Sequence, residues 1–214
     1  MNGLVAWIFA EYALLAMVVP GLTMLRRTVR GKLALAVGLP AAASLPLVAA
    51  ARLQVLLFLG TPGEAVAFVV AAQALALGFA AALCGASALL SRRWPVGGPA
   101  AVTVAALLVL ASPAWGDVVL LVRSEPVMLA GQKWLVAANP LFSVSEAGGF
   151  DWTHAAAMYN LSTRIGEDLT YAPVSWRVLA AVYGGAGLAM AVLSALVRQK
   201  GRPAEYLLSP GERL

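Results

Sequence analysis

The sequence predicts an all-α membrane protein, a bundle of about five transmembrane helices with short interfacial or re-entrant helices in its last external loop. Two observations lead to this class. The chain of 214 residues is 61% hydrophobic and 12% charged, with a mean hydropathy of +0.84, whereas soluble domains carry about 25% charged residues. The apolar residues also gather in runs of about 20, the length of a helix that crosses a ~30 Å hydrocarbon core.

Five apolar runs are the expected spans. They cover residues 4–25, 33–50, 65–90, 99–121 and 176–197. The second contains Pro40 and Pro46, which membrane helices tolerate where neighbouring helices satisfy the freed carbonyl groups. The first has its basic cluster after the apolar run, so it is interpreted as a retained helix rather than a cleaved signal peptide. We expect one transmembrane domain, 1–197, with an external loop at 122–175 and a cytoplasmic tail at 198–214.

Ten of the fifteen basic residues fall on one side of this bundle. Those that follow the first, third and fifth runs are Arg26, Arg27, Arg30, Lys32, Arg92, Arg93, Arg198, Lys200, Arg202 and Arg213. Because Lys and Arg collect in cytoplasmic loops, five alternating helices put the N-terminus outside and the C-terminus in the cytoplasm. The net charge of +5 is then a topology signal, and nucleic acid is not an expected partner. The alanine-rich composition suits a bacterial inner membrane.

The residue inventory does not favour chemistry by this chain. Cys84 and His154 are each the single residue of their type, so no disulfide, thiolate metal site or multi-histidine metal site is expected. The sequence lacks a P-loop glycine pattern before Lys32, and it contains neither a zincin motif nor a nucleophile elbow. We therefore expect no catalytic, cofactor or metal site, and we expect any ATP hydrolysis to be performed by a partner subunit.

Two polar residues interrupt the predicted spans. Glu11 is the acidic residue within an apolar run, and an ionisable group at membrane depth indicates a functional role. Its depth of about one to two turns from the outer end equally lets it reach the interface or a partner helix. Gln73 is interpreted as an interhelical hydrogen-bonding group. Small residues form rows that suit either a packed bundle or a dimer seam: Gly78, Ala82, Gly85, Ser87, Gly184, Gly185, Gly187 and Ala191.

The stretch WLVAANPLFSVSEAGGFDW, residues 134–152, is too polar to span a bilayer. It follows a short apolar segment from Val127 that predicts an interfacial or re-entrant helix, with Trp134 at headgroup level. Asn139–Pro140 is expected to end that helix, because the residue before proline is disfavoured in the helical region. A second short helix is expected from Leu141 to Glu146.

These features resemble the permease subunit of type-2 ABC exporters. Ser112–Pro113, Trp134 and Asn139–Pro140–Leu141 match the order of residues in that family's last external loop. The hairpin GFAAALCGASALLSRRWPVGGPAAVTVAALLVLASP is similar to its helix–basic turn–helix unit. RRTVRGKLALAVGLP, residues 26–40, resembles its cytoplasmic element. The number of spans is that of a permease lacking the family's first transmembrane helix.

The resemblance implies roles and partners. A cytoplasmic ATP-binding subunit and either a second copy of this chain or a second permease subunit are implied, within a lipid bilayer. The ATPase-coupling candidates are Arg26, Arg27, Arg30, Gly31 and Lys32. The external gate candidates are Trp134, Asn139, Pro140, Leu141 and Glu146.

Two other functions remain open from the sequence. One is a non-catalytic structural or accessory subunit of a larger respiratory or photosynthetic membrane complex, which the small size and lack of catalytic motifs favour. The other is a membrane enzyme that uses Glu11 or the external acidic residues.

Overall fold

The computed structural model describes residues 3–25, 62–115, 124–147 and 174–200, together with isolated helical positions at 31, 34, 38 and 42. Within these ranges the chain is all-helical, as the composition predicts. The helices are α1 (Gly3–Leu25), α3 (Pro62–Leu90), α4 (Gly97–Leu110), α5 (Ser112–Trp115), α6 (Glu125–Ala138), α7 (Pro140–Ala147) and α9 (Trp176–Lys200). The run predicted at 33–50 lies outside the described residues apart from positions 34, 38 and 42.

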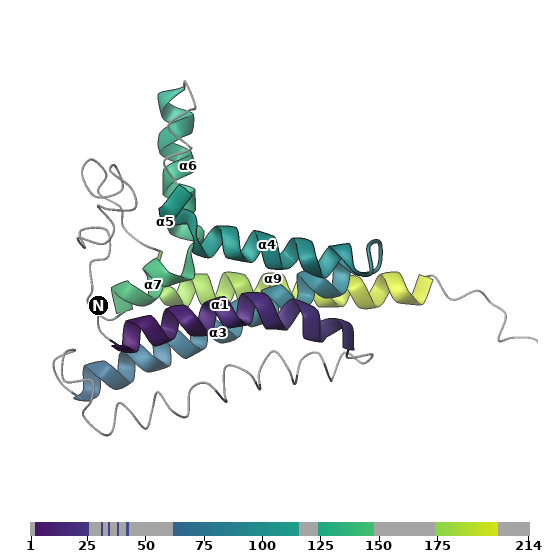
Figure 1. Cartoon of the computed structure of the whole chain (residues 1–214), viewed down its shortest axis with the longest axis horizontal. Coiled ribbons are helices and arrows are strands. Elements are labelled where there is room, and N and C mark those ends of the chain that lie inside the picture. Colours follow the sequence, from purple (N-terminus) through teal and green to yellow (C-terminus); the bar gives the residue numbers. More distant parts are fainter. Residues whose placement is uncertain are drawn as a thin grey trace, which may run out of the picture.

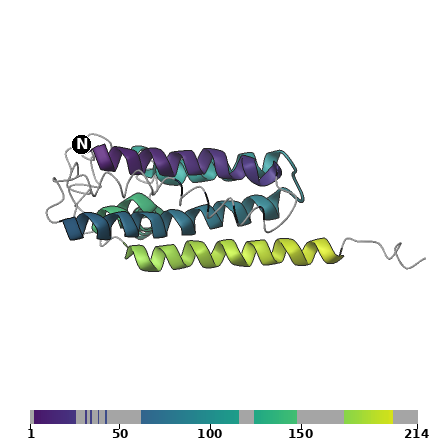
Figure 2. The same ribbon diagram turned by 90° about the horizontal axis from the view of Figure 1, so that it is seen from below.

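The long helices lie side by side, and α3 is the central one. In Figure 1, α1, α3 and α9 run in one direction and α4 runs in the other. Figure 2 shows α3 between α9 on one side and α1 with α4 on the other. The burial of the two longest apolar stretches follows from this arrangement: 72% of the stretch in α3 is buried, against 17% of the one in α9.

In the described part of the chain, two helices are long and apolar enough to cross a membrane, over Phe68–Leu90 and Trp176–Val197. Shorter apolar helical stretches occupy Ile8–Thr23 and Gly97–Leu110. These four stretches coincide with four of the five runs that the sequence predicts, so the helices themselves are confirmed in the described part of the chain.

The contact between α3 and α9 is built on glycine. A Cβ atom on Gly78 would lie 2.6 Å from the carbonyl oxygen of Ala180, and one on Gly85 would overlap the carbonyl group of Gly187. The sequence offset is the same in both pairs, as expected for two parallel helices in a fixed register. Small residues allow helix backbones to approach this closely. The predicted small-residue rows therefore serve packing within this chain.

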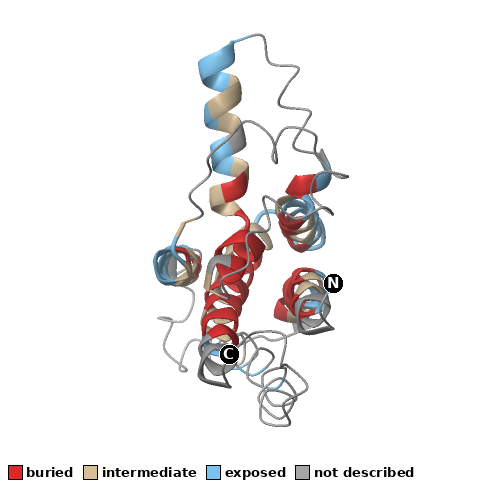
Figure 3. Ribbon diagram, turned by 90° about the vertical axis from the view of Figure 1, so that its left-hand side faces the viewer, coloured by how far each residue is buried: buried red, intermediate tan, exposed pale blue. Residues whose placement is uncertain are grey.

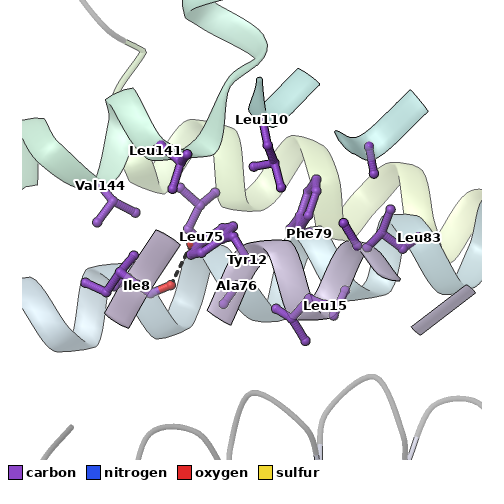
Figure 4. Close-up of a cluster of buried hydrophobic side chains, with 14 of the residues drawn as sticks. Ile8, Tyr12, Leu15, Leu75, Ala76, Phe79, Leu83, Leu110, Leu141 and Val144 are labelled. Atoms are coloured by element: carbon purple, nitrogen blue, oxygen red, sulfur yellow. Dashed lines mark hydrogen bonds between the residues drawn. The ribbon is translucent and has the colours of Figure 1, made fainter. Parts of the chain in front are cut away.

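Aromatic side chains fill the space between α1, α3 and α9. Tyr12 is fully buried, its ring centroid lies 5.7 Å from that of Phe79, and its hydroxyl donates to the Ala72 carbonyl at 2.8 Å. Phe79 also packs edge-on against Tyr183 of α9, with a centroid distance of 5.4 Å. Figure 4 shows Tyr12 and Phe79 within an apolar cluster that Leu110 and Leu141 cover.

The apolar run predicted at 99–121 does not form one helix. α4 ends at Leu110, and a single turn, α5, follows Ala111. Proline has no N–H group, so Pro113 cannot donate to the carbonyl of Val109 and continue the α4 ladder. The backbone N–H of Ala111 makes the last bonds, to Leu107 and Val109. The predicted run of 99–121 is therefore interrupted at Ala111, and its last six residues lie outside the described part of the chain.

We predict that Gly187→Ala destabilises the fold, because the added Cβ would lie 2.6 Å from the backbone nitrogen of Ala82. Overpacking of this kind costs about 1–3 kcal/mol. Thermal unfolding can be followed by a thiol-reactive dye, since Cys84 is the single cysteine and is buried. Gly185→Ala is the matched control, because no atom lies within 4 Å of the added Cβ. Equal melting temperatures for the two variants would contradict the packing described.

Candidate functional site

The boundary between α6 and α7 is the most densely hydrogen-bonded place in the described structure. α6 ends at Ala138 and α7 begins at Pro140, with Asn139 in an extended conformation between them. The Oδ1 atom of Asn139 accepts a hydrogen bond from the Leu141 backbone N–H at 3.0 Å. Asn139 thus caps α7, because its side chain satisfies an N–H group that has no partner within the helix.

The amide nitrogen of the same residue reaches the end of α4. Asn139 Nδ2 donates to the Leu110 carbonyl at 3.2 Å and to Ser112 Oγ at 3.1 Å. Leu110 is the last residue of α4, so its carbonyl group would otherwise have no partner. Asn139 is fully buried and Ser112 is 2% exposed. One side chain therefore satisfies groups at the start of α7 and at the end of α4.

A fourth helix, α9, also contacts this boundary. The hydroxyl of Tyr183 in α9 donates a hydrogen bond to the carbonyl of Ala138, the last residue of α6. We call the group formed by Leu110, Ser112, Ala138, Asn139, Leu141 and Tyr183 the Asn139 junction. It joins α4, α6, α7 and α9. Apart from the bond that caps α7, its hydrogen bonds connect residues that are far apart in the sequence.

The two short helices at the junction have opposite surroundings. In α7, five consecutive residues, 141–145, are buried, and Figure 1 shows this helix against the bundle. α6 instead projects across the direction of the long helices (Figures 1 and 3), with Val136 buried near its base. Trp134 is 73% exposed and Val127 is 58% exposed. The expected pair of short helices with Trp134 on the surface is therefore present.

Apolar residues lie on every side of α6. At 100° per residue, Val127, Ala130 and Trp134 fall together, but Leu129 and Val136 lie on the same half of the helix as Glu125 and Lys133. Trp134 and Val127 are therefore exposed on one side of α6, and Val136 is buried on another.

A second polar contact joins α1 to α3. Gln73 Nε2 donates to Glu11 Oε2 at 2.9 Å, beside the bond from Tyr12 to Ala72. Glu11 is 5% exposed. The two intramembrane polar candidates are thus partners, which agrees with the expectation that Glu11 reaches a neighbouring helix and that Gln73 bonds between helices. Glu11 Oε1 and Gln73 Oε1 are buried without a hydrogen-bond partner.

The other predicted site residues lie partly outside the described part of the chain. Arg26, Arg27, Arg30 and Lys32 lie outside the described residues, and Gly31 is helical and half-buried. Glu146 lies in the last turn of α7, and Pro140 is fully buried. The coupling candidates therefore remain predictions.

Sequence reasoning missed the roles of Tyr12 and Tyr183. A usable signal was present, because a buried tyrosine needs a partner for its hydroxyl group. The partner in each case is a backbone carbonyl of another helix, which no side-chain motif reveals.

Comparison of the chain with protein-family models, with curated proteins and with solved structures finds no match. The geometry of the described residues is therefore the basis for a functional proposal.

We predict that Asn139→Ala lowers the free energy of unfolding by about 1–3 kcal/mol, because it leaves buried backbone groups of α4 and α7 without partners. Ser143→Ala is the matched control on the same helix, since Ser143 is fully buried and its Oγ has no hydrogen-bond partner. That control should match or exceed the stability of the wild type. Thermal unfolding followed through Cys84 reactivity distinguishes them, and an equal loss in both variants would refute a special role for Asn139.

Proposed function

We propose that this chain is a membrane-spanning subunit of an exporter driven by a separate ATPase, with the properties of a type-2 ABC permease. The observation that carries the membrane setting is the surface of α9, which is apolar over Trp176–Val197 while 17% of this stretch is buried. A core helix of a soluble protein would be covered by other elements. Leu188 is 66% exposed and Val182 is 58% exposed, and large exposed apolar surfaces indicate contact with lipid or with another protein.

Lipid is the proposed environment because exposed apolar side chains occur on every long helix. They include Leu14 and Met17 of α1, Val70 of α3, Val104 and Leu108 of α4, and Val178 and Val192 of α9. A single protein partner would cover one face rather than all four helices. A bilayer that surrounds the bundle would contact the exposed apolar side chains of all four helices.

The proposed topology has five spans, with the N-terminus outside and the C-terminus in the cytoplasm of a bacterial cell. The helix directions in Figure 1 support it, because α1, α3 and α9 run one way and α4 runs back. The turn from α3 to α4 contains Arg92 and Arg93, both exposed, and basic turns favour the cytoplasmic side. The second span, 33–50, supplies the remaining crossing.

The Asn139 junction is the proposed outer closure of the translocation path. Its hydrogen bonds connect α6 and α7 to the end of α4 and to Tyr183 of α9, so movement of α4 or α9 would move the two short helices. Trp134, Asn139, Pro140, Leu141 and Glu146 are the proposed gate. Arg26, Arg27, Arg30, Gly31 and Lys32 are the proposed contact with the ATPase. A second copy of this chain, or a second permease subunit, would complete the path.

The alternative is a non-catalytic accessory subunit of a larger membrane complex. The exposed face of α9 would support this alternative if a neighbouring subunit, rather than lipid, covered Leu188 and Val192. Such a chain would purify with redox or pigment-bearing subunits instead of an ATPase.

The topology can be tested with two matched tryptophans. Trp94 is 55% exposed in the α3–α4 turn, and Trp134 is 73% exposed on α6. In a Cys84→Ala background, we predict that Trp134→Cys reacts with a membrane-impermeant maleimide in spheroplasts. Trp94→Cys should react only after the membrane is opened. Equal labelling of both in intact spheroplasts would exclude the five-span topology, and the reverse pattern would invert it.

The ATPase partner can be tested by purification of the tagged full chain from its own host in mild detergent, followed by mass spectrometry. We predict a stoichiometric ATP-binding cassette protein. The double variant Arg30→Ala, Lys32→Ala should weaken its association, because two of the four candidate coupling charges are removed. Trp134→Ala, at the proposed outer side, is the control that should retain it. Cofactor-bearing subunits in its place would favour the accessory function.

A further inference from the structure

The contact between α1 and α3 holds an unsatisfied pair of oxygen atoms. Gln73 Nε2 donates to Glu11 Oε2 at 2.9 Å, while Glu11 Oε1 and Gln73 Oε1 are both buried without a hydrogen-bond partner. All four polar atoms belong to two side chains that already face each other. Leaving a buried polar atom unpaired costs about 1–3 kcal/mol, and here two acceptors are unpaired at once.

The chemistry of the two groups defines what is missing. An ionised carboxylate only accepts hydrogen bonds, and the amide oxygen of glutamine also only accepts. Two acceptors cannot satisfy each other. A protonated carboxyl group, however, gains one O–H donor. One proton on Glu11 Oε1 changes that oxygen from an acceptor into a donor, for which Gln73 Oε1 is the available acceptor.

We propose that Glu11 and Gln73 form a binding site for one proton, which holds α1 against α3 as a carboxylic acid–amide pair. In the occupied state each group donates once and accepts once: the Gln73 amide donates to Glu11 Oε2, and the Glu11 hydroxyl donates to Gln73 Oε1. The O–H bond of Glu11 is the one bond that forms, and the charge of the side chain changes from −1 to zero.

The surroundings of Glu11 support a neutral pair. Glu11 is 5% exposed, and its described hydrogen-bond partner is Gln73. An isolated carboxylate is costly to bury unless it is paired or becomes neutral. Three described arginines have other partners: Arg92 donates to Ser194 of α9, Arg93 lies over Trp94, and Arg177 lies over Trp176.

Besides Glu11, the titratable side chains on the long helices are Tyr12 of α1, Glu64 and Cys84 of α3, and Arg177, Tyr183, Arg198 and Lys200 of α9. Tyr12 lies next to Glu11 on α1, and Tyr183 of α9 packs against Phe79. Cys84 lies three turns further along α3. α4 contains no titratable side chain. Among the described groups, then, none supplies a positive charge that would hold Glu11 ionised.

The proposed site also acts on the helix packing. Tyr12 and Ala72 form a second bond between α1 and α3 directly beside the pair. Loss of the proton would leave two acceptor oxygens, Glu11 Oε1 and Gln73 Oε1, buried without partners next to this bond. Proton release is therefore expected to weaken the contact of α1 with α3. This inference does not depend on an ATPase partner.

The direct test is infrared difference spectroscopy of the full chain in nanodiscs at about pH 7. Exposed carboxyl groups are ionised there, because glutamate titrates at about 4.3 in solution. We expect the C=O stretching band of a neutral carboxylic acid in the wild type and its loss in Glu11→Gln. Gln73→Leu should retain the band but shift it to higher frequency, because the hydrogen-bond acceptor is gone.

The stability test uses the same variants. If the folded chain binds one proton more than the unfolded chain, its free energy of unfolding falls as pH rises. Relative to Glu11→Gln, the folding constant of the wild type should then fall by up to tenfold per pH unit above about pH 4.3, where glutamate in the unfolded chain is ionised, until the folded site releases its proton. Tyr12→Phe is the control: it removes the neighbouring bond between the same helices and should weaken folding without changing this slope.

The proposal is wrong if the wild type has no carboxylic acid band at about pH 7, or if the band persists in Glu11→Gln. Should Glu11→Gln fail to fold, the comparison of the wild type with Gln73→Leu decides. A band at the same frequency in both would show that the acid is not bonded to Gln73.

Discussion

The close approach of α3 and α9 sets the geometry of the rest of the bundle. Gly78 and Gly85 remove the side chains that would separate the two backbones, and the resulting register is fixed at both ends. At one end it brings Tyr183 to the last carbonyl of α6. At the other, Ser194 donates to the carbonyl of Ala88. In lipid, where apolar contact alone gives little net association, such backbone proximity and a few hydrogen bonds decide how helices pair.

The polar side chains of the bundle are used to satisfy helix ends and to join helices. Asn139 serves two helix ends with one amide group, and Glu11 with Gln73 serves one helix pair. Both contacts are buried, so each is strong only while every member keeps its partners. The two differ in one respect. Asn139 has partners for both ends of its amide, whereas Glu11 and Gln73 each retain an unpaired oxygen. The Asn139 contact is therefore complete without a proton, whereas the proposed Glu11–Gln73 contact is complete only when a proton is bound.

The sequence predicted the helices well where local signals determine them. Apolar runs gave α1, α3 and α9, and Asn139–Pro140 correctly divided α6 from α7, because proline acts on its immediate neighbours. Prediction failed where partners are distant. The end of α4 depends on Pro113 together with an amide 29 residues away. The targets of Tyr12 and Tyr183 are backbone carbonyls, which every residue carries. The choice between internal packing and a dimer seam required the register of α3 with α9.

The shortness of α4 has a consequence for the lipid around the bundle. Its 14 residues rise about 21 Å, which is less than a hydrocarbon core of ~30 Å. In the proposed membrane setting, the leaflet above its end is occupied by α5 and α7 rather than by a continuing helix. Hydrophobic mismatch of this kind is relieved by local thinning. Lipids with shorter acyl chains would then be favoured beside α4, and lipids with longer acyl chains beside the longer helices.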